Sequence, residues 1–421
     1  MPDPQSDLRQ MFDAAVAAAD PHLCLPPHLP PVPAGRTVVV GAGKAAAAMA
    51  AALETHWPGP LSGLVITRYG HAAATRTIEV LEAAHPTPDL NGVEATARLL
   101  TSLDGLTADD LVICLLSGGG SALLTAPPPG VSLEDKRSVV SALLRSGAPI
   151  AQINAVRRRL SRVKGGRLRQ AAGPARVLTL AISDAPGDDP ATIASGPTVA
   201  DPTASGDALA ILQRYGVDVS PAARAWLADP ASQGPQLPAA RPDDYRLIAT
   251  PALSLEAAAR VATDLGYQPV VLGDAIEGEA RDLARRHAAM ALNLAGGLSR
   301  DGKPIVLISG GETTVTVVGS GRGGRNTEYL LALGVALDGA AGIHALAADT
   351  DGIDGVEDNA GAILAPDSLA RAAAAGVLAT ARLADNDAYG FFGAIDGLVF
   401  TGPTRTNVND FRAIILTPRT S

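Results

Sequence analysis

Between residues 36 and 183 the chain alternates short apolar runs with segments of helical character, and this regularity constrains the fold most. Near-continuous apolar strands separated by helices are typical of a parallel sheet that helices cover on both faces. The sequence therefore predicts an α/β fold with a doubly wound, mostly parallel sheet. We expect strands at 36–42, 62–68, 77–83, 110–117 and 176–183, and helices at 44–53, 91–102, 132–146 and 153–171.

A change in composition divides the chain. The segment 200–245 is rich in Pro, Ser, Asp and Ala and has weak periodicity, so we expect a domain boundary there. This predicts an N-terminal domain over 1–240 and a C-terminal domain over 241–421, in line with about 100–200 residues per domain. The C-terminal part again alternates strand-like and helix-like runs, which predicts a second α/β domain.

The overall charge is acidic: 34 Lys and Arg face 43 Asp and Glu, for a formal net charge of −9. A general nucleic-acid binder would show a basic face, so that class is disfavoured, whereas a local basic cluster can still bind a small anion. Two cysteines do not make a disulfide framework. The first residues lack the basic region of a secretory signal, and the apolar runs fall short of the ~18 residues of a membrane span. We therefore expect a soluble, cytoplasmic protein with neither a membrane nor a nucleic-acid partner.

The loop GAGKAA begins at Gly41 and fits the relaxed dinucleotide fingerprint G-x-G-x-x-A. A nicotinamide site also needs an acidic residue at the end of the second strand, but Thr67 and Arg68 stand there. Arg68 would suit a 2′-phosphate, so NADP stays open. Alternatively, Gly41 and Gly43 only allow a tight turn. Neither interpretation explains Lys44, whose cation at a helix start is unfavourable unless an anion joins it.

A second glycine-rich loop, SGGGS, follows the strand expected at 110–117. Successive backbone N–H groups in such a loop form an anion nest, and the following helix adds its N-terminus. The loop is not a Walker A motif, which would require G-x-x-x-x-G-K-[ST]. The alternative is a close backbone approach. We expect an anion site formed by Ser117, Gly118, Gly119, Gly120 and Ser121.

A third loop, GSGRGGRNTEYLL, leads into an apolar helix and carries Arg322 and Arg325. Asn326 or Thr327 can cap this helix. Arg325 would then stand at the helix start beside a bound anion, where a guanidinium matches phosphate or carboxylate geometry. Arg322 also fits a surface position.

Two acidic clusters each follow an expected strand. Carboxylates with glycines at strand ends suit Mg²⁺, which prefers one or two carboxylates together with substrate phosphates. The second cluster resembles the start of an EF-hand loop, but its twelfth position is Ala360 instead of Glu. For any one of these residues, an Asx-turn or helix cap is the alternative. The first cluster contains Asp184, Asp188 and Asp189, and the second contains Asp349, Asp351 and Asp354.

Basic residues crowd the segment INAVRRRLSRVKGGRL from residue 153 to residue 168. A solvated charged face is the ordinary interpretation, but one or two of these side chains could bind an anionic substrate. Two histidines, His71 and His85, could also donate to an anion, although a lone histidine is more often structural. No G-x-S-x-G motif supports acyl transfer. The candidates for substrate binding are Arg157, Arg158, Lys164 and His71.

Anion nests, cations at helix starts and carboxylates for a divalent cation together form the set that phosphoryl transfer requires. The chain also resembles the bacterial and archaeal glycerate 2-kinases of the MOFRL type, from about Leu8 to Leu416, with a thin match between 203 and 300. The motifs that carry the resemblance are GAGKAAAAMA, EAAHPTPD, LLSGGGSALL, INAVRRRLSRVKGGRL, ISDAPGDDPATIASGPTVADP, ISGGETTVTVVGSGRGGRNTEYLLAL and ADTDGIDG.

This resemblance implies a kinase that uses ATP and Mg²⁺ to convert D-glycerate to 2-phosphoglycerate. It also implies a Rossmann-like N-terminal domain, a C-terminal MOFRL domain and an active cleft between them. By the same resemblance, the essential lysine and arginine of the family fall on Lys44 and Arg325.

Our working hypothesis places the ATP phosphates on the Ser117–Ser121 nest, with Gly41 and Gly43 as further cofactor-binding residues. Asp189 or Asp351 would hold Mg²⁺, and Asp189 is also a candidate catalytic carboxylate. Lys44 and Arg325 would neutralise the transferred group. A NAD(P)H-dependent hydroxypyruvate reductase is the alternative, and a non-enzymatic ligand sensor is a distant third. A homodimer stays open.

Overall fold

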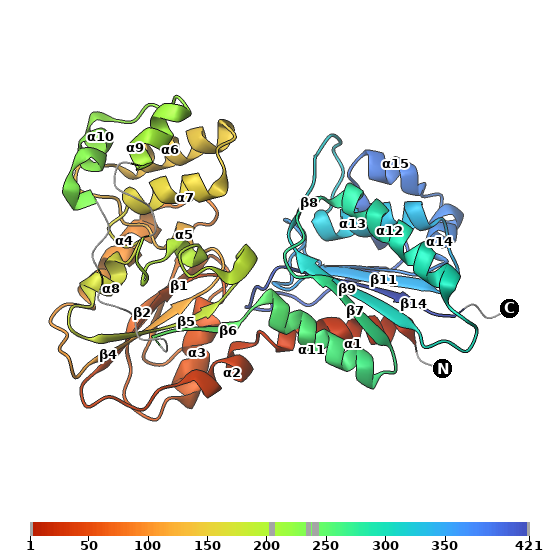
Figure 1. Ribbon diagram of the computed structural model, residues 1–421, viewed down its shortest axis with the longest axis horizontal. Coiled ribbons are helices and arrows are strands. Elements are labelled where there is room, and N and C mark those ends of the chain that lie inside the picture. Colours follow the sequence, from red (N-terminus) through yellow and green to blue (C-terminus); the bar gives the residue numbers. More distant parts are fainter. Residues whose placement is uncertain (1–2, 202–206, 233–236, 238–243, 419–421) are drawn as a thin grey trace. The chain divides into compact units, whose positions relative to one another are not determined.

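The computed structural model describes residues 3–201, 207–232, 237 and 244–418, and the chain divides into two compact units (Figure 1). The N-terminal unit is Pro21–Ile248, and the C-terminal unit combines Met1–Asp20 with Ala249–Ser421. The boundary segment expected at 200–245 lies partly outside the described residues. The division after Ile248 falls close to its end.

A six-stranded sheet in the order β3-β2-β1-β4-β5-β6 forms the centre of the N-terminal unit. The pairings from β3 through to β5 are parallel, as expected. This is the strand order of a Rossmann sheet, in which ligands bind at the carboxyl ends of the strands where the order reverses. That point lies at β1 and β4. The strands are β1 (Thr37–Ala42), β2 (Ser62–Arg68), β3 (Glu79–Ala83), β4 (Leu111–Leu116), β5 (Arg176–Ile182) and β6 (Tyr245–Ala249).

Helices cover this sheet because β1 and β4 are buried along their whole length. Leu99 of α4 and Leu168 of α8 share one core cluster with Val38 and Val40 of β1. The helix α3 packs against β1, β2 and β4. Near the sheet the helices are α2 (Pro21–Cys24), α3 (Ala46–His56), α4 (Leu90–Thr101), α5 (Gly120–Leu123) and α8 (Arg167–Ala171).

A separate group of helices has its own core, in which Leu143, Val156, Leu212 and Leu227 pack together. Its members are α6 (Leu133–Arg145), α7 (Ile150–Arg159), α9 (Asp207–Arg214) and α10 (Pro221–Ala228). The single helix predicted at 153–171 was wrong, because α7 ends at Arg159 and α8 begins only at Arg167. Gly165 and Gly166, with φ of +58° and +83°, form the intervening turn.

The C-terminal unit contains a second six-stranded sheet, in the order β13-β12-β11-β14-β9-β7. Its pairings are antiparallel except for β7 with β9, which is parallel. Two short strands, β8 (Gly278–Glu279) and β10 (Thr313–Thr314), pair with each other. The large sheet consists of β7 (Gln268–Gly273), β9 (Ile305–Gly311), β11 (Ile343–Asp349), β12 (Gly361–Leu364), β13 (Leu398–Val399) and β14 (Asp410–Leu416).

Helices pack on both faces of this sheet because successive strand residues point to opposite sides. Leu307 and Ile414 share a core with α12 and α13, whereas Val306 and Phe411 share another with α1 and α11 (Figure 1). The helices are α1 (Pro4–Ala17), α11 (Pro251–Asp264), α12 (Ala280–Gly297), α13 (Arg325–Leu337), α14 (Ser368–Ala374), α15 (Ala379–Ala384) and α16 (Ala388–Gly393).

The position of α1 differs from the expected domain division, which placed the first 240 residues together. Its apolar face contains Leu8, Met11 and Phe12, all fully buried among residues of the C-terminal unit. The rings of Phe12 and Phe411 lie 5.8 Å apart, and Tyr267 donates a hydrogen bond to Asp7 at 2.6 Å. The chain therefore begins in the C-terminal unit, enters the N-terminal unit and returns.

Both cysteines are free thiols, and Cys114 is buried within β4. Burial raises the pKa of the Cys114 thiol, so it is inert core material. Among the helices of the described residues, none combines the length and apolar character needed to cross a membrane.

Candidate active site

The loop after β1 packs tightly against the loop after β4. The backbone N–H of Lys44 donates to the Gly118 carbonyl at 2.8 Å, and the N–H of Ala45 donates to Ser117 Oγ at 2.9 Å. A Cβ on Gly43 would lie 2.1 Å from Ser117 Oγ, and one on Gly41 would lie 2.0 Å from the Leu115 carbonyl oxygen. Gly41 therefore allows the close approach of β1 to β4, and Gly43 allows the close approach of the loops that follow them. The alternative offered by the sequence was a tight turn alone.

This arrangement bears on dinucleotide binding. A Rossmann dinucleotide site presents the N–H groups at the start of the first helix to the pyrophosphate. Here α3 begins at Ala46, and the N–H groups of Lys44 and Ala45 already bond the neighbouring loop. The Ala46 N–H bonds the Gly43 carbonyl. Few donors are left for a pyrophosphate at this turn.

The Ser117–Ser121 loop is buried at its first residue and partly exposed further along. Ser117 is fully buried, whereas Gly119 and Ser121 are partly exposed. Gly119 adopts a φ of +79°, and Ser121 Oγ lies 2.7 Å from Ser195 Oγ. Gly119 and Ser121 are thus the members of the predicted nest that a ligand can reach.

Cations gather at this edge of the sheet around His85. A Cβ on Gly119 would lie 3.0 Å from His85 Cδ2, which places the ring beside the loop. Burial and the charges of Lys44, Arg68 and Arg157 lower the pKa of His85 to about 4. His85 is therefore a neutral imidazole at physiological pH, surrounded by positive charge.

His71 is also buried at this edge, and its backbone N–H donates to the Arg68 carbonyl at 3.0 Å. Its charge is a further contributor to the low pKa of His85, so the two rings are neighbours. The structure therefore brings Lys44, Arg157 and His71 together with the Ser117–Ser121 loop.

Two other predicted substrate residues have internal partners. Arg158 is buried and its Nε lies 2.8 Å from Asp201 Oδ1, in a buried ion pair. Lys164 is fully buried, and its ammonium donates to the carbonyls of Ser121 at 2.6 Å and Leu124 at 2.7 Å. Arg158 and Lys164 therefore stabilise the loops and helices next to the carboxyl edge of the sheet. Their positions are explained without a substrate.

Asp189 lies in an exposed turn after β5. Its carboxylate accepts hydrogen bonds from the Ala191 N–H at 3.0 Å and the Thr192 hydroxyl at 3.2 Å. This is the Asx-turn geometry that the sequence left open as the alternative. Its neighbour Asp188 has a φ of +54°, a conformation that is uncommon outside glycine.

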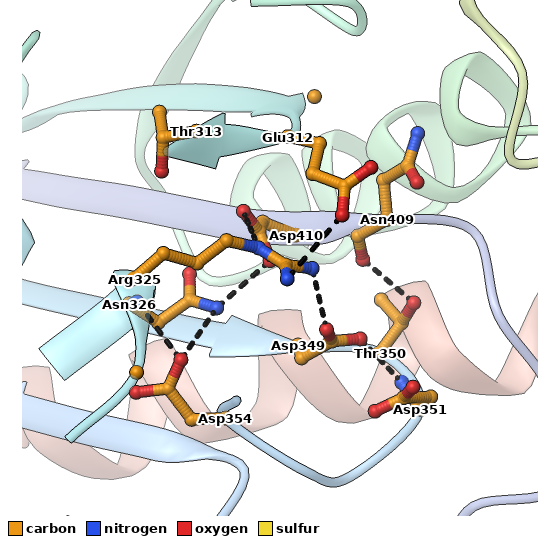
Figure 2. Close-up of polar contacts among 12 residues, drawn as sticks. Glu312, Thr313, Arg325, Asn326, Asp349, Thr350, Asp351, Asp354, Asn409 and Asp410 are labelled. Carbon is orange, nitrogen blue, oxygen red and sulfur yellow. Dashed lines mark hydrogen bonds and ion pairs between the residues drawn. The ribbon is translucent and has the colours of Figure 1, made fainter. Parts of the chain in front are cut away.

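In the C-terminal unit, Arg325 lies at the centre of a group of carboxylates (Figure 2). Its Nε lies 2.9 Å from both carboxylate oxygens of Asp410, and Nη2 lies 2.7 Å from Asp349 Oδ2. Nη1 lies 3.3 Å from Glu312 Oε1. Burial opposes the charge of Arg325, but Asp410 and Asp349 outweigh it and raise the pKa above its ordinary value. Arg325 is permanently charged and rigidly held.

The start of α13 is occupied by a side chain of the protein itself. The buried carboxylate of Asp354 accepts from the N–H groups of Asn326 and Thr327, each at 2.9 Å, and from the Thr327 hydroxyl at 2.8 Å. Arg325 stands at the start of α13 as expected, but the N–H groups of Asn326 and Thr327 are bonded to Asp354 and are not available to a bound anion. Arg322 lies at the surface, where it pairs with Glu357.

Asp351 is buried at the end of β11, next to Asp349. Its N–H donates to Asp349 Oδ1 at 2.9 Å, and its own Oδ1 accepts from the Ile353 N–H at 2.9 Å. Across the described parts of the chain, no group of three or more His, Cys, Asp or Glu side chains could hold a metal ion. Asp189 and Asp351, the two predicted metal ligands, belong to different units.

Sequence reasoning missed Asp410 and Arg412 of β14. Arg412 is 1 % exposed and donates to Asp410 Oδ2 at 2.7 Å, so it helps to hold the carboxylate that binds Arg325. Two charges two residues apart on an otherwise apolar strand were a usable signal, because they share one face. Lys136 of α6, which is buried beside Arg157, gave no comparable signal.

The fold and the site define a two-unit α/β protein with a Rossmann sheet and a cationic, glycine-rich edge that suits phosphorylated ligands. A family model described as a domain of unknown function (DUF4147) matches residues 7–228, and one described as the MOFRL family matches residues 305–410. The D-glycerate 2-kinase of Thermotoga maritima is 38% identical over 95% of this chain and 95% of its own length. The chain belongs to the MOFRL-type glycerate kinase family.

Two further comparisons agree on the family and differ in name. The crystal structure of glycerate kinase from Thermotoga maritima has a TM-score of 0.90 with 36% sequence identity, over 98% of this chain and 100% of that chain. A protein from Agrobacterium vitis that carries the name of a hydroxypyruvate reductase is 54% identical over 97% of this chain and 94% of its own length. The name of a reductase and the name of a kinase thus occur within one family.

Proposed function

We propose that this protein transfers the γ-phosphoryl group of ATP to the 2-hydroxyl of D-glycerate. The observation that carries the proposal is the gathering of Lys44, Arg68 and Arg157 beside a partly exposed glycine loop, where burial and these charges together lower the pKa of His85 to about 4. Phosphoryl transfer depends mainly on positioning and on stabilising the charge of the transferred group. A cationic edge with backbone donors supplies both.

The roles follow from the contacts. The accessible part of the Ser117–Ser121 loop, Gly119 and Ser121, would bind phosphate oxygens. Lys44, at the start of α3, would neutralise charge on the transferred group. Arg325 is the second cation that we assign to the reaction, and Asp349 and Asp410 fix its guanidinium in one orientation.

The acceptor needs a cationic or hydrogen-bonding partner for its carboxylate. Because Arg158 and Lys164 have internal partners, Arg157 and His71 are the remaining candidates from the sequence. Their place beside the Ser117–Ser121 loop supports this role.

Mg²⁺ would neutralise the phosphates of the nucleotide when bound. It typically takes one or two protein carboxylates and completes its shell with phosphate oxygens and water, so a group of three protein ligands is not required. Asp189 or Asp351 would supply such a carboxylate.

A NAD(P)H-dependent hydroxypyruvate reductase is the second candidate, and the name of the Agrobacterium vitis relative favours it. The occupied N–H groups of Lys44 and Ala45 count against it, because the pyrophosphate of a dinucleotide would need them. The absence of an acidic residue at the end of β2, where Arg68 stands, counts against NAD in particular.

Lys44→Met tests the proposal. We expect glycerate-dependent ADP release to fall roughly 10²–10³-fold, the usual cost of removing one charge-stabilising group. Arg224→Gln, on the exposed surface of α10, is the control and should keep full activity. Thermal unfolding of both variants shows whether the fold is intact. A folded Lys44→Met protein with wild-type turnover would refute the assigned role of the lysine.

A further inference from the structure

A pocket of about 630 Å³ opens beside the Ser117–Ser121 loop, within the N-terminal unit. Helix α6, the segment that follows β3 and Arg157 of α7 form its walls, and Ser121 belongs to both the pocket and the loop. Its volume lies within the roughly 300–1,000 Å³ of pockets that hold drug-sized ligands. It is much larger than a three-carbon acid needs.

The walls of the pocket combine apolar and cationic groups. Pro86, Pro88, Val140 and Leu144 supply apolar surface, and Arg137 holds this wall together by donating to the Pro88 carbonyl at 2.7 Å. The carboxylate that lines the pocket, Glu134, lies 3.6 Å from Arg137. An apolar surface next to cations suits a ligand with a flat ring at one end and negative charge at the other.

Three cations lie in or next to this pocket without a carboxylate partner among the residues that the structure describes. Lys136 is 4 % exposed and donates to the Leu160 carbonyl at 3.0 Å, and Lys164 is fully buried and donates only to carbonyls. Arg157 donates to Asn154 Oδ1 at 3.3 Å.

The three cations also disfavour one another's charged forms. Burial and the charge of Arg157 lower the pKa of Lys136 to about 7. Burial and the charges of Lys136 and Arg157 lower the pKa of Lys164 well below its ordinary value. Buried positive charge without a negative partner destabilises a protein, so an anion that binds in the same space would stabilise this one.

We propose that this pocket binds the nucleotide: its phosphates lie against Ser121, Arg157 and Lys136, and its nucleoside lies on the apolar wall formed by Pro86, Pro88, Val140 and Leu144. The proposal rests on the proposed kinase function and goes beyond it by assigning the place of the donor. It removes Arg157 from the acceptor site and leaves His71 there.

Two variants test the pocket. Arg157→Gln removes a cation, and Ser141→Trp, from the half-buried face of α6, places a large ring in the pocket. Binding of ADP is measured by calorimetry, and KM is measured separately for ATP and D-glycerate. We expect the Kd of ADP and the KM of ATP to rise roughly ten- to hundredfold, as for the loss of a hydrogen bond to a charged group. The KM of D-glycerate should stay within about twofold, a small difference on the same scale.

The outcomes separate the two proposals. Arg224→Gln should behave as wild type in every measurement, and thermal unfolding identifies a variant that fails to fold. If wild-type protein turns over D-glycerate and both variants bind ADP normally, the pocket assignment is wrong and the kinase function stands. A selective rise in the KM of D-glycerate would make the pocket the acceptor site and would also overturn the assignment. If wild type binds ADP in a pocket-dependent way but never phosphorylates D-glycerate, only the proposed function fails.

Discussion

Three glycine substitutions can separate the reasons for the glycines in the GAGKAA loop. Gly41→Ala would place a Cβ 2.0 Å from the Leu115 carbonyl oxygen without demanding a positive φ, so it creates a clash alone. Gly70→Ala faces open space at a φ of +77°, so it creates backbone strain alone. Gly43→Ala has both defects, with a φ of +146° and a Cβ 2.1 Å from Ser117 Oγ.

The magnitudes follow from these two causes. Strain at Gly70→Ala should cost about 1–2 kcal/mol. The clash at Gly41→Ala should cost about 1–3 kcal/mol or more, because the opposing atoms are backbone. The sum predicts about 2–5 kcal/mol for Gly43→Ala if the two causes add. With about 2–4 °C per kcal/mol for a unit of this size, the melting temperature of Gly43→Ala should fall by roughly 4–20 °C.

Calorimetry of the three variants is the assay, with glycerate-dependent ADP release as a second measurement. Because Gly70 directly precedes His71, Gly70→Ala serves as the control for stability alone. Gly43→Ala should lose activity even where it folds, since the bond from Ala45 to Ser117 must shift. If Gly41→Ala and Gly43→Ala prove no less stable than Gly70→Ala, the close approach of the two loops is not what these glycines serve.

Three further predictions concern the charges. Asp354→Asn should destabilise the C-terminal unit by about 2–4 kcal/mol, because the amide NH2 that replaces Oδ2 cannot accept from the Thr327 N–H and hydroxyl, and these buried donors lose their acceptor. Exposed Asp358→Asn should change stability by less than about 0.5 kcal/mol, and equal melting temperatures would contradict the cap. Arg158→Met should cost about 1.5–3 kcal/mol by removing the closer of the two guanidinium groups that pair with buried Asp201, the other being Arg159 at 3.8 Å, with an unchanged KM for D-glycerate. A raised KM at unchanged stability would make Arg158 a substrate residue after all. ADP affinity should fall between pH 7 and 9, because Lys136, with a pKa of about 7, loses its proton in this range. The phosphate stays ionised there, above its own pKa near 6. If the fall in ADP affinity with pH persists in Lys136→Met, the titration of Lys136 is not its cause.

The fold of the N-terminal unit could be predicted because its signal is local. Each of the five expected strands matches an observed strand to within two residues at either end, since a buried parallel strand must be apolar along its length. The break between α7 and α8 was missed because charged residues with helical spacing conceal the turn at Gly165 and Gly166. The packing of α1 on the C-terminal unit depends on contacts with residues such as Phe411, far along the chain, which periodicity does not report.

The site was predictable in kind more than in detail. The sequence placed two glycine-rich loops at the carboxyl edge of the sheet, and Lys44 and Ser121 lie there. It could not distinguish Arg157, which lines a pocket, from its neighbour Arg158, which pairs with Asp201, because adjacent helical residues differ only in the direction they face. It also could not show that Asp354 caps α13, since that depends on the path of the loop after β11.

One measurement tests the central claim, that this edge of the sheet serves phosphoryl transfer and not hydride transfer. Purified protein is given D-glycerate, ATP and Mg²⁺, with the products identified by ³¹P NMR. In parallel it is given hydroxypyruvate with NADH or NADPH, and the loss of the reduced cofactor is followed by absorbance. We expect 2-phosphoglycerate and ADP in the first reaction and no loss of reduced cofactor in the second. Oxidation of NADH or NADPH without any phosphoglycerate would contradict the account.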